Sequence, residues 1–571
     1  MTSFTYDIAR AQALEAVRRA LGEPAELTVT IPPSGVAADL AVPCFPLAGR
    51  LRKSPQDVAA QLAAAIEPTG LLASARAEGG YVNFTVHRGE FTAGVMGELA
   101  RLGDRFGSHE VGAGRTLVID YSAPNVARPM SVGHLRSTII GDSLYRLSKF
   151  TGYHPIGDNH LGDWGTQFGS LLYGFMAWVD REAYTADPIA ELLRLYVKFD
   201  EDARKDPALR DRAREWHLRL EQGDPQARAL WQEFIRHSLA EFQKTYDLLD
   251  VTFDYTLGES FYEDKMAEVV EEAVRRGVAV EDQGALIVRL DDAGLDTPLI
   301  LRRSDGATLY ATRDLATAIY RIRTFHPAKI LYVVGADQRL HFKQLFATLR
   351  RLGHDQAEYV HVDFGLVRLP EGRMSTRRGR VVFLEDVLGE AVVRARKLVD
   401  DRNPELPEVE RAEVARIVGI GAIKYADLSQ NRVKNIVFDW DRMLALDGDS
   451  APYLQYTYVR ARSILRKAGE HPHSGHFDAR AAATAEEWAL VKHLGQFPEV
   501  VLQAAHTYHP HVVANYLFHL AQLFHAFYHE VPVLQAGDDP LRRSRLQLVE
   551  GIATVMRTGL GLLGIRVPER M

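Results

Sequence analysis

Ser131, Gly133 and His134 stand where a polar loop passes into an apolar, helix-periodic segment, in "SAPNVARPMSVGHLRSTIIGDSL". The first N–H groups of a helix have no partner within it, and the helix dipole adds partial positive charge at that end, so anions bind there. Gly133 would let a nucleotide approach the backbone closely, and His134 offers a ring nitrogen beside it. The pattern favours a phosphate-binding helix start, although a plain capping role also explains an isolated Gly-His pair.

A second group with phosphate chemistry is the basic loop "LPEGRMSTRRGRV". Its arginines are Arg373, Arg377, Arg378 and Arg380, and Arg368 directly precedes it. Such a density of positive charge on a turn can stabilise the charge that develops on a polyphosphate in a transition state. The alternative is a solvated loop with basic side chains.

The elements around the first group predict a parallel sheet. A strand-like run, "TLVIDYS", precedes the loop, a helix is expected from about residue 132 to 151, where Gly152 stops it, and "YHPIGD" is the next strand. Alternation of this kind is typical of parallel strands joined by crossover helices. The first strand ends in Asp120, its loop carries Asn125 and Arg128, and the polar loop "GDNHLGDWGTQFG" follows the second strand, so we expect these side chains to meet in one crevice.

The rest of the chain divides into four parts. Residues 1–110 form a small α/β unit with the strand-like "GYVNFTV", and residues of about 180–280 are a charged helical insertion. Strand-like runs then return at "GALIVRL", "PLILRR", "KILYVVG" and "YVHVDFGLVRL", which we interpret as the completion of the sheet. From residue 385 to 571 the pattern is helical.

Composition narrows the class of protein. A chain of 571 residues should form about three to five domains. The single cysteine, Cys44, excludes an internal disulfide framework and zinc sites of the paired-cysteine type. No window approaches the ~18 apolar residues of a membrane span, and the N-terminal segment carries charges through its apolar positions, so we expect a cytoplasmic protein. The net charge of −7 does not exclude a nucleic-acid partner, since local basic patches suffice.

Together these motifs resemble the arginyl-tRNA synthetases, a family of class I aminoacyl-tRNA synthetases. Besides the two loops after the predicted strands, the resemblance rests on "LYATRDLATAIYR", "YVVGADQRLHF", "GRMSTRRG", "FDWDRMLALDGDSAPYLQY" and "GIRVPERM", in the family's order from about residue 80 onward. It implies an α/β fold: a small N-terminal tRNA-contacting domain (1–110), a Rossmann-type parallel-sheet catalytic domain (111–384) with its helical insertion, and linker helices with an all-α anticodon-binding domain (385–571).

The resemblance also implies site residues. Ser131, Gly133, His134 and Arg128 would serve ATP and catalysis. Arg373, Met374 and Ser375 match the family's second ATP loop, in which lysines are usual. This sequence departs from the pattern at Arg128 and Arg373, where arginine replaces lysine, and at Ser131, where a histidine is expected.

The amino acid would be arginine. Carboxylate and hydroxyl acceptors match the planar fork of a guanidinium, and Tyr310 and Asp314, four residues apart, share a helix face. In the family these positions and Asp120 hold the guanidinium, while Asn125 and Gln338 hold the α-amino group. A salt bridge from Asp314 to Arg313, and a core-edge position for Tyr310, are the alternatives. Because such a site rejects analogues that lack the donors, no editing domain is expected.

The transfer RNA would contact both ends of the chain. Tyr81 and Asn83 match the family's N-terminal element, against the alternative of a plain edge strand. In the helical tail the candidates for base contacts are Tyr453, Tyr456, Tyr528 and Met571, and those for phosphate contacts are Arg542, Arg543 and Arg545. The alternative for the tyrosines is a place in the helical core.

The predicted function is therefore the ATP-dependent charging of tRNA(Arg) with L-arginine, by a monomer with ATP and Mg²⁺ and without a membrane partner. Two alternatives remain at this stage. An adenylate-forming nucleotidyl transferase without tRNA is disfavoured by the helical tail and the "GYVNF" unit. A tRNA-binding paralogue with attenuated catalysis is motivated by the three departures and disfavoured by the retention of Asn125, His134, Asp314 and Gln338.

Overall fold

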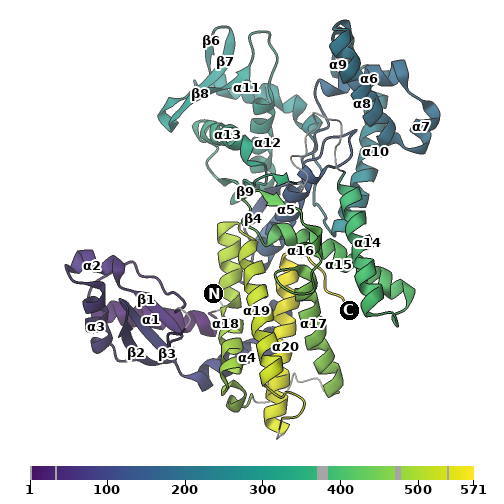
Figure 1. Cartoon of the computed structure of the whole chain (residues 1–571). Coiled ribbons are helices and arrows are strands. Elements are labelled where there is room, and N and C mark those ends of the chain that lie inside the picture. The colour runs from purple at the N-terminus through teal and green to yellow at the C-terminus, as the bar shows by residue number, and fades with distance from the viewer. Residues whose placement is uncertain (1–2, 33–34, 369–382, 470–476, 537–538) are drawn as a thin grey trace.

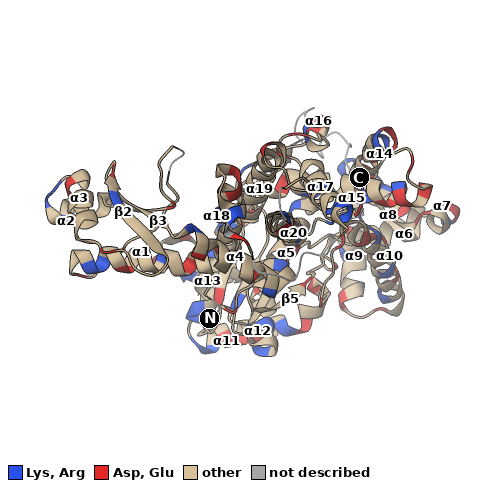
Figure 2. Ribbon diagram, turned by 90° about the horizontal axis from the view of Figure 1, so that it is seen from below, with Lys and Arg blue, Asp and Glu red and all other residues tan. Residues whose placement is uncertain are grey.

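The computed structural model describes residues 3–32, 35–368, 383–469, 477–536 and 539–571. It has an N-terminal domain at one side, a helical bundle at the centre and two lobes at the top of the view (Figure 1). Lys and Arg are interspersed with Asp and Glu over the helices (Figure 2). No helix in the described part of the chain combines the length and the apolar character that crossing a bilayer requires.

The N-terminal domain is a three-stranded antiparallel sheet with helices. Its elements are α1 (Thr5–Leu21), β1 (Leu40–Pro43), α2 (Phe45–Leu51), α3 (Pro55–Ala65), β2 (Leu72–Glu78), β3 (Tyr81–Val86) and α4 (Arg88–Leu102). The strand order is β1-β3-β2, so β3, which carries "YVNF", is the central strand and not an edge.

The catalytic sheet has four parallel strands in the order β10-β9-β4-β5, which confirms the predicted parallel sheet. The strands are β4 (Thr116–Asp120), β5 (His154–Asp158), β9 (Lys329–Tyr332) and β10 (Glu358–His361). Three helices connect or precede them: α5 (Val132–Phe150), α12 (Tyr310–Phe325) and α13 (Arg339–Arg351). The strand order reverses between β4 and β9, and ligands of such sheets bind outside the carboxyl ends of the strands at this switch point.

Alternation along β4 shows how the sheet is packed. Leu117 and Ile119 lie in one buried cluster with residues of α5, whereas Val118 lies in a second cluster with residues of α12 and α13. Successive side chains of a strand point to opposite faces, so Asp120 falls on the side of Val118 and α12. The last residue of β4 is therefore presented to α12.

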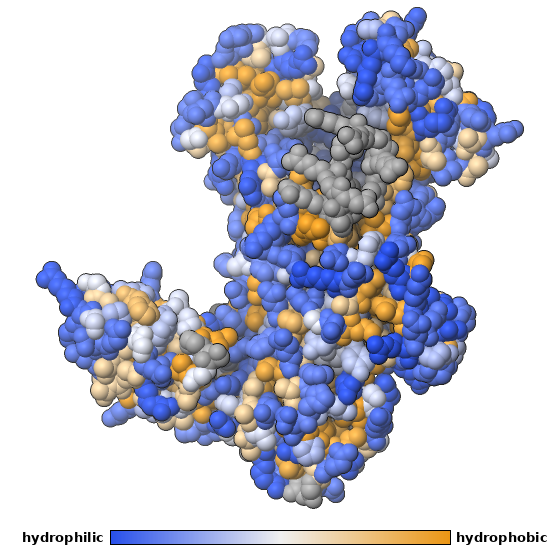
Figure 3. Space-filling model, viewed as in Figure 1, coloured by the Kyte–Doolittle hydropathy of each residue, from blue (hydrophilic) through white to orange (hydrophobic). Residues whose placement is uncertain are grey.

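The insertion forms the two lobes. One lobe is helical, with α6 (Gln167–Trp178), α7 (Arg181–Ala186), α8 (Pro188–Lys205), α9 (Ala208–Glu221) and α10 (Pro225–Leu249). The other holds the 3₁₀ segment η2 (Glu259–Lys265), α11 (Met266–Arg275), β6 (Val280–Asp282), β7 (Ala285–Leu290) and β8 (Leu295–Arg302). The surface is hollowed between the lobes (Figure 3).

The strand-like runs "GALIVRL" and "PLILRR" do not complete the parallel sheet, so that interpretation is wrong. They are β7 and β8, which pair antiparallel with each other and with β6 in a separate sheet. A short turn of 3₁₀ helix at Asp291–Ala293 joins β7 to β8. A connection this short permits an antiparallel pair, whereas parallel strands need a crossover of a dozen residues or more.

The C-terminal part is helical, as predicted, apart from a two-residue strand. Its helices are α14 (Leu384–Arg402), α15 (Glu408–Leu428), α16 (Trp440–Met443), α17 (Ala451–Ala468), α18 (Ala485–Thr507), α19 (His511–Glu530) and α20 (Asp539–Leu562). Side-chain caps fix several starts: the Ser450 hydroxyl accepts from the N–H of Tyr453, and Thr484 and Glu487 form a reciprocal capping box. The strand β12 (Ile436–Val437) pairs with β11 (Val367–Arg368).

Helix α5 is tied to this helical part by buried polar contacts. Arg136 forms an ion pair with Asp427 of α15 at 2.9 Å, and both side chains are 1% exposed. The hydroxyl of Ser143 donates to the Leu562 carbonyl at 2.9 Å. The Lys424 ammonium donates to the Gly564 carbonyl at 2.7 Å and lies 3.9 Å from Asp142 of α5. The start of α5 is thereby fixed relative to the end of the chain.

Candidate active site

The start of α5 has the features of an anion site. Ser131 is the N-cap, and its backbone N–H donates to Nδ1 of His134 at 3.0 Å. Since Nδ1 accepts, a neutral His134 carries its proton on Nε2, which is then a donor. Burial lowers the pKa of His134 and so favours this neutral form.

The backbone at Gly133 is open. A Cβ built there would meet one described atom within 4 Å, the Ser131 hydroxyl oxygen at 3.3 Å, outside its chain neighbours and its own helix turn. By contrast, a Cβ on Gly141 of the same helix would lie 2.3 Å from the Tyr121 ring. Among the described residues, packing does not require a glycine at 133, and none of them fills the space above it.

The loop between β4 and α5 is strained and closely held. Ser122, Ala123 and Ala127 have φ of 78°, 40° and 63°, a region that costs energy for residues other than glycine. The N–H of Ser122 donates to the Ser137 hydroxyl at 3.0 Å, and that of Ala127 donates to the Ser238 hydroxyl at 2.8 Å. Strain of this kind is maintained only where the surroundings fix the backbone, as at binding sites.

Asn125 lies exposed on this loop against the loop that follows β5. The N–H of Val126 donates to the Gly162 carbonyl, and the N–H of Gly162 donates to the Pro124 carbonyl, both at 3.1 Å. A Cβ on Gly162 would lie 2.3 Å from Oδ1 of Asn125, so glycine is needed for this approach. The two polar loops predicted to meet are therefore in contact.

Arg128 is directed toward the insertion. Its guanidinium carbon lies 3.8 Å from the centre of the Tyr196 ring on α8, a cation–π contact. This partner could not be predicted from local patterns, because Tyr196 is on a helix of the inserted lobe.

The second ATP loop, with Arg373, Met374 and Ser375, lies outside the described residues. Both of its flanks are placed. Arg368 pairs with Val437 in the short sheet of β11 and β12, and Phe383 forms a bridge with Ser131. The N–H of Leu384 donates to the Met130 carbonyl at 2.8 Å. The C-terminal flank of the second loop is therefore anchored at the start of α5.

The amino-acid side of the crevice is formed by α12 and α13. Helix α12 begins at Tyr310, whose side chain is 60% exposed and whose ring centre lies 5.0 Å from that of His341. Asp314 lies on the same face, and its Oδ2 is 2.6 Å from Nε2 of His341. Arg313, the alternative partner of Asp314, pairs instead with Glu259 and Glu263.

His341 was not predicted as a site residue. It is buried on the first turns of α13, where its Nε2 donates to the carboxylate of Asp314 and its ring packs against that of Tyr310. The motif "YVVGADQRLHF" contains it, but nothing in the spacing indicates that α13 packs beside the start of α12.

Asp120 does not stand free in the crevice. Its Oδ2 lies 2.8 Å from Nη2 of Arg321, which is 0% exposed and also pairs with Asp158 at 2.8 Å. Arg321 was not predicted either, although one signal was present. Residues 310 and 314 are four apart and residues 314 and 321 are seven apart, and these spacings place all three on one face of a helix.

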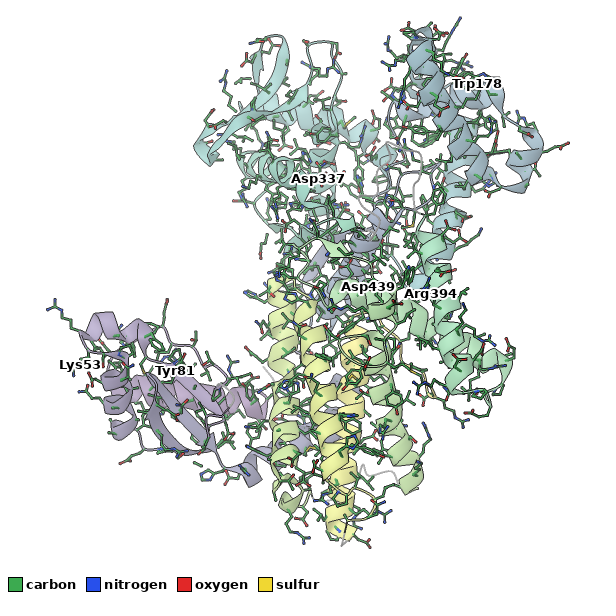
Figure 4. The ribbon with its side chains drawn as sticks, viewed as in Figure 1. Lys53, Tyr81, Trp178, Asp337, Arg394 and Asp439 are labelled. Carbon is green, nitrogen blue, oxygen red and sulfur yellow. The ribbon has the colours of Figure 1, made fainter. Side chains whose placement is uncertain are left out.

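Gln338 ends the short 3₁₀ turn that follows β9, and its amide nitrogen lies 3.5 Å from Oδ2 of Asp337. Asp120 ends β4, Asn125 follows β4 and Gln338 follows β9, so these three residues flank the switch point. Figure 4 shows Asp337 near the carboxyl end of the sheet, far from Tyr81 on the N-terminal domain.

The predicted tRNA contacts fall into two groups. Tyr456, Tyr528 and Met571 line one cleft of about 570 Å³ in the helical domain. Arg460 lies among them, 4.1 Å from the Tyr528 ring centre, and donates to the Tyr456 hydroxyl at 2.7 Å. Tyr453 is not among the residues that line this cleft and packs against Phe518.

At the other end of the molecule Tyr81 packs edge-on against the exposed ring of Phe45, with centres 5.3 Å apart, while Asn83 is buried. The prediction of a phosphate contact at Arg545 is wrong. Arg545 is buried and forms an ion pair with Glu487 at 2.7 Å, because two helices of the bundle bring the charges together. Arg542 is partly buried, with its guanidinium 3.5 Å from the Ala468 carbonyl.

Comparisons with known proteins agree along the chain. Three family models match: arginyl tRNA synthetase N terminal domain at residues 8–86, tRNA synthetases class I (R), catalytic domain at 101–440, and DALR anticodon binding domain at 454–571. Arginine–tRNA ligases of Halothermothrix orenii and Clostridium perfringens are 42% and 45% identical, each over 96% of both chains. The solved arginyl-tRNA synthetase of Thermus thermophilus superposes with a TM-score of 0.84 at 28% identity, over 98% of this chain and 100% of that one.

The crevice at the switch point, the helical domain and these matches lead to one assignment. The chain belongs to the arginyl-tRNA synthetase family of class I aminoacyl-tRNA synthetases.

Proposed function

We propose that this chain activates L-arginine with ATP and transfers it to the 3′ end of tRNA(Arg). The observation that carries the proposal is the meeting of two kinds of chemistry at the switch point. The open helix start at Gly133 and His134 suits phosphate, and the carboxylates of Asp120 and Asp314 suit a guanidinium.

In the first step the carboxylate of arginine attacks the α-phosphorus of ATP, the bond to the bridging oxygen breaks, and pyrophosphate leaves with the electron pair. In the second step the 2′-hydroxyl of the terminal adenosine attacks the activated carbonyl, loses its proton, and displaces AMP. The protein's part is positioning and the stabilisation of phosphate charge. Neutral His134 donates from Nε2, and the N–H groups at the start of α5 add partial positive charge.

The remaining site residues take the following roles in the proposal. Ser131 fixes the ring of His134, and Arg128, with Arg373, Met374 and Ser375 of the second loop, serves ATP. Tyr310 joins the two carboxylates at the guanidinium, and Asn125 and Gln338 hold the α-amino group.

Mg²⁺ would neutralise negative charge on the ATP phosphates. The donors that this ion prefers are oxygens, and it usually binds substrate phosphates with only one or two carboxylates. On this chemistry we assign Mg²⁺ to the phosphates of the nucleotide.

The tRNA would lie across both ends of the molecule. We assign contacts with its outer corner to Tyr81 and Asn83 in domain 1–110, and contacts with the anticodon loop to Tyr453, Tyr456, Tyr528 and Met571 in domain 385–571. The catalytic domain, 111–384, lies between them in sequence. We propose further that the protein acts as a monomer in the cytoplasm.

The test is a charging assay with purified protein, labelled arginine and total tRNA, run beside arginine-dependent pyrophosphate exchange with and without tRNA. Labelled tRNA is expected with arginine and with no other amino acid. Pyrophosphate exchange without any charging of tRNA would favour a nucleotidyl transferase. Tight tRNA binding with neither reaction would favour the attenuated paralogue.

A further inference from the structure

A row of polar side chains crosses the carboxyl edge of the catalytic sheet. Asp158 ends β5 and is the register partner of Asp120, which ends β4 and is in turn the partner of Tyr332 at the end of β9. Register partners on parallel strands point to the same face, so these three side chains all point toward α12. Two carboxylates placed side by side repel each other unless a cation lies between them.

Arg321 of α12 is that cation. Its side chain is 0% exposed, its Nε and Nη2 lie 3.0 and 2.8 Å from Oδ2 of Asp158, and Nη2 also lies 2.8 Å from Oδ2 of Asp120. The guanidinium carbon is 5.6 Å from the ring centre of Tyr332. A planar fork can bridge two carboxylates in this way, whereas a lysine ammonium cannot match both in one plane.

The cluster is incomplete in two respects. Nη1 of Arg321, Oδ1 of Asp158 and the hydroxyls of Tyr262 and Tyr332 are buried without a hydrogen-bond partner in the described part of the chain. Two carboxylates and one guanidinium also leave one negative charge in excess. Uncompensated buried charge is costly, so a second cation at this place would be strongly attracted.

We infer that Arg321 and Asp158 are positioning residues of the amino-acid pocket: they fix Asp120 at the end of β4 and leave the buried cluster one positive charge short, which the guanidinium of the substrate makes up. The inference rests on the proposed function, since it assumes that arginine binds beside Asp120. It adds that the charge preference of the pocket is set by a residue, Asp158, that the substrate does not touch.

The groups that face Asp158 are Arg321, Asp120, His160 and the hydroxyl of Tyr262. Burial raises the pKa of Asp158 above its ordinary value, although Arg321 opposes the shift. The positive charge of bound arginine favours the ionised form of Asp158. Arginine binding should therefore release a proton at any pH at which Asp158 of the free protein is protonated. The KM for arginine should therefore rise as the pH falls through the pKa of the free protein.

The experiment compares the wild type with Asp158→Asn in aminoacylation with saturating ATP and tRNA. Asparagine keeps the shape and can still accept from Arg321, but it removes the excess charge. We expect the KM for arginine to rise about tenfold, the scale of one unit charge acting through a protein interior. The kcat and the KM values for ATP and tRNA should stay within twofold. L-Citrulline, which is neutral, should inhibit both proteins equally, so that selectivity for arginine over citrulline falls about tenfold as well.

Glu272→Gln is the matched control. Glu272 is a buried carboxylate outside the crevice. It pairs at 3.3 Å with Arg323, which lies on α12 as Arg321 does. It should leave the KM for arginine unchanged. Arg321→Lys is the second variant. It keeps the positive charge but loses the planar guanidinium that bridges the two carboxylates, so it should also raise the KM for arginine. If Asp158→Asn does not fold, this variant tests the inference.

The outcomes test the inference about Asp158 and the proposed function separately. If the wild type charges tRNA but Asp158→Asn keeps the wild-type KM, pH profile and citrulline selectivity, the inference is wrong and the proposed function stands. An equal rise of KM in Glu272→Gln would also overturn it, since the effect would then be structural. If the wild type charges no tRNA with arginine, the proposed function itself fails.

Discussion

Replacing Gly133 with alanine should impair the use of ATP while leaving the stability of the fold almost unchanged. The φ of Gly133 lies outside the positive region, and its Cβ would touch only the rotatable hydroxyl of Ser131, at 3.3 Å, among the described atoms beyond its neighbours. Alanine is the better helix former by up to about 1 kcal/mol. The free energy of unfolding should therefore change by less than about 1 kcal/mol, in either direction.

The effect on activity should be larger. If a phosphate lies against the backbone at Gly133, the new methyl group occupies its space, and overpacking of this kind costs about 1–3 kcal/mol. That corresponds to a loss of about 5- to 150-fold in kcat/KM for ATP. The KM for tRNA should be unchanged.

Two other glycines provide the controls. Gly141→Ala would set a Cβ 2.3 Å from the ring of Tyr121, which is itself held by a hydrogen bond from its hydroxyl to Thr252, so this variant should lose stability. The Cβ of Gly389→Ala on α14 would meet no described atom within 4 Å outside its chain neighbours and its own helix turn, so this variant should change neither property. The measurements are urea denaturation and ATP-dependent pyrophosphate exchange for all three variants. Full activity of Gly133→Ala would refute the assignment of the open space at α5 to ATP.

The remaining predictions concern single side chains. Ser131→His should change charging by less than about tenfold, about 1.4 kcal/mol, because the contact with His134 is made by the backbone N–H of residue 131; a change of several orders in the charging rate would contradict this. Asp314→Ala should reduce kcat/KM for arginine about 10- to 150-fold, since it removes a charged hydrogen-bond acceptor, with tRNA affinity in filter binding unchanged; an unchanged kcat/KM for arginine would show that the pocket is misplaced. Burial lowers the pKa of His493 to about 3 from 6.5. The unfolded chain therefore takes up a proton between these values that the folded chain does not, and stability falls by up to about 1.4 kcal/mol per pH unit as the pH drops below about 6.5. Urea denaturation at pH 5 and 6.5 should show a steeper loss of stability in the wild type than in His493→Gln, which lacks this one group but keeps the other histidines with lowered pKa; equal losses in the two proteins would exclude the assignment.

Local patterns predicted most of the fold. The helix expected from about residue 132 to 151 is Val132–Phe150, and four of the strand-like runs form the parallel sheet. The error at β7 and β8 has a physical cause. A short apolar run fits a parallel or an antiparallel sheet equally well, and here the short connection, not the apolar pattern, decides the pairing.

The site was harder to predict where its residues act through partners. Gly133, His134 and Asp314 are visible in the sequence because their chemistry and spacing are local. The pairing of Arg321 with Asp158 spans 163 residues of chain, and that of Asp314 with His341 depends on how two helices pack. Arg545 shows the opposite error: a cluster of three arginines within four residues indicated a phosphate contact, but its partner Glu487 lies 58 residues earlier in a buried pair.

The contacts of α5 with the end of the chain affect how deletion experiments are designed. Removing residues 563–571 would take away the Gly564 carbonyl and leave the Lys424 ammonium, only 1% exposed, without its acceptor next to the middle of the nucleotide-site helix. A buried donor left unsatisfied costs about 1–3 kcal/mol, and more when it is charged. A shortened chain would then lose arginine activation together with tRNA binding. The contribution of Met571 to tRNA recognition is therefore better measured by substitution than by truncation.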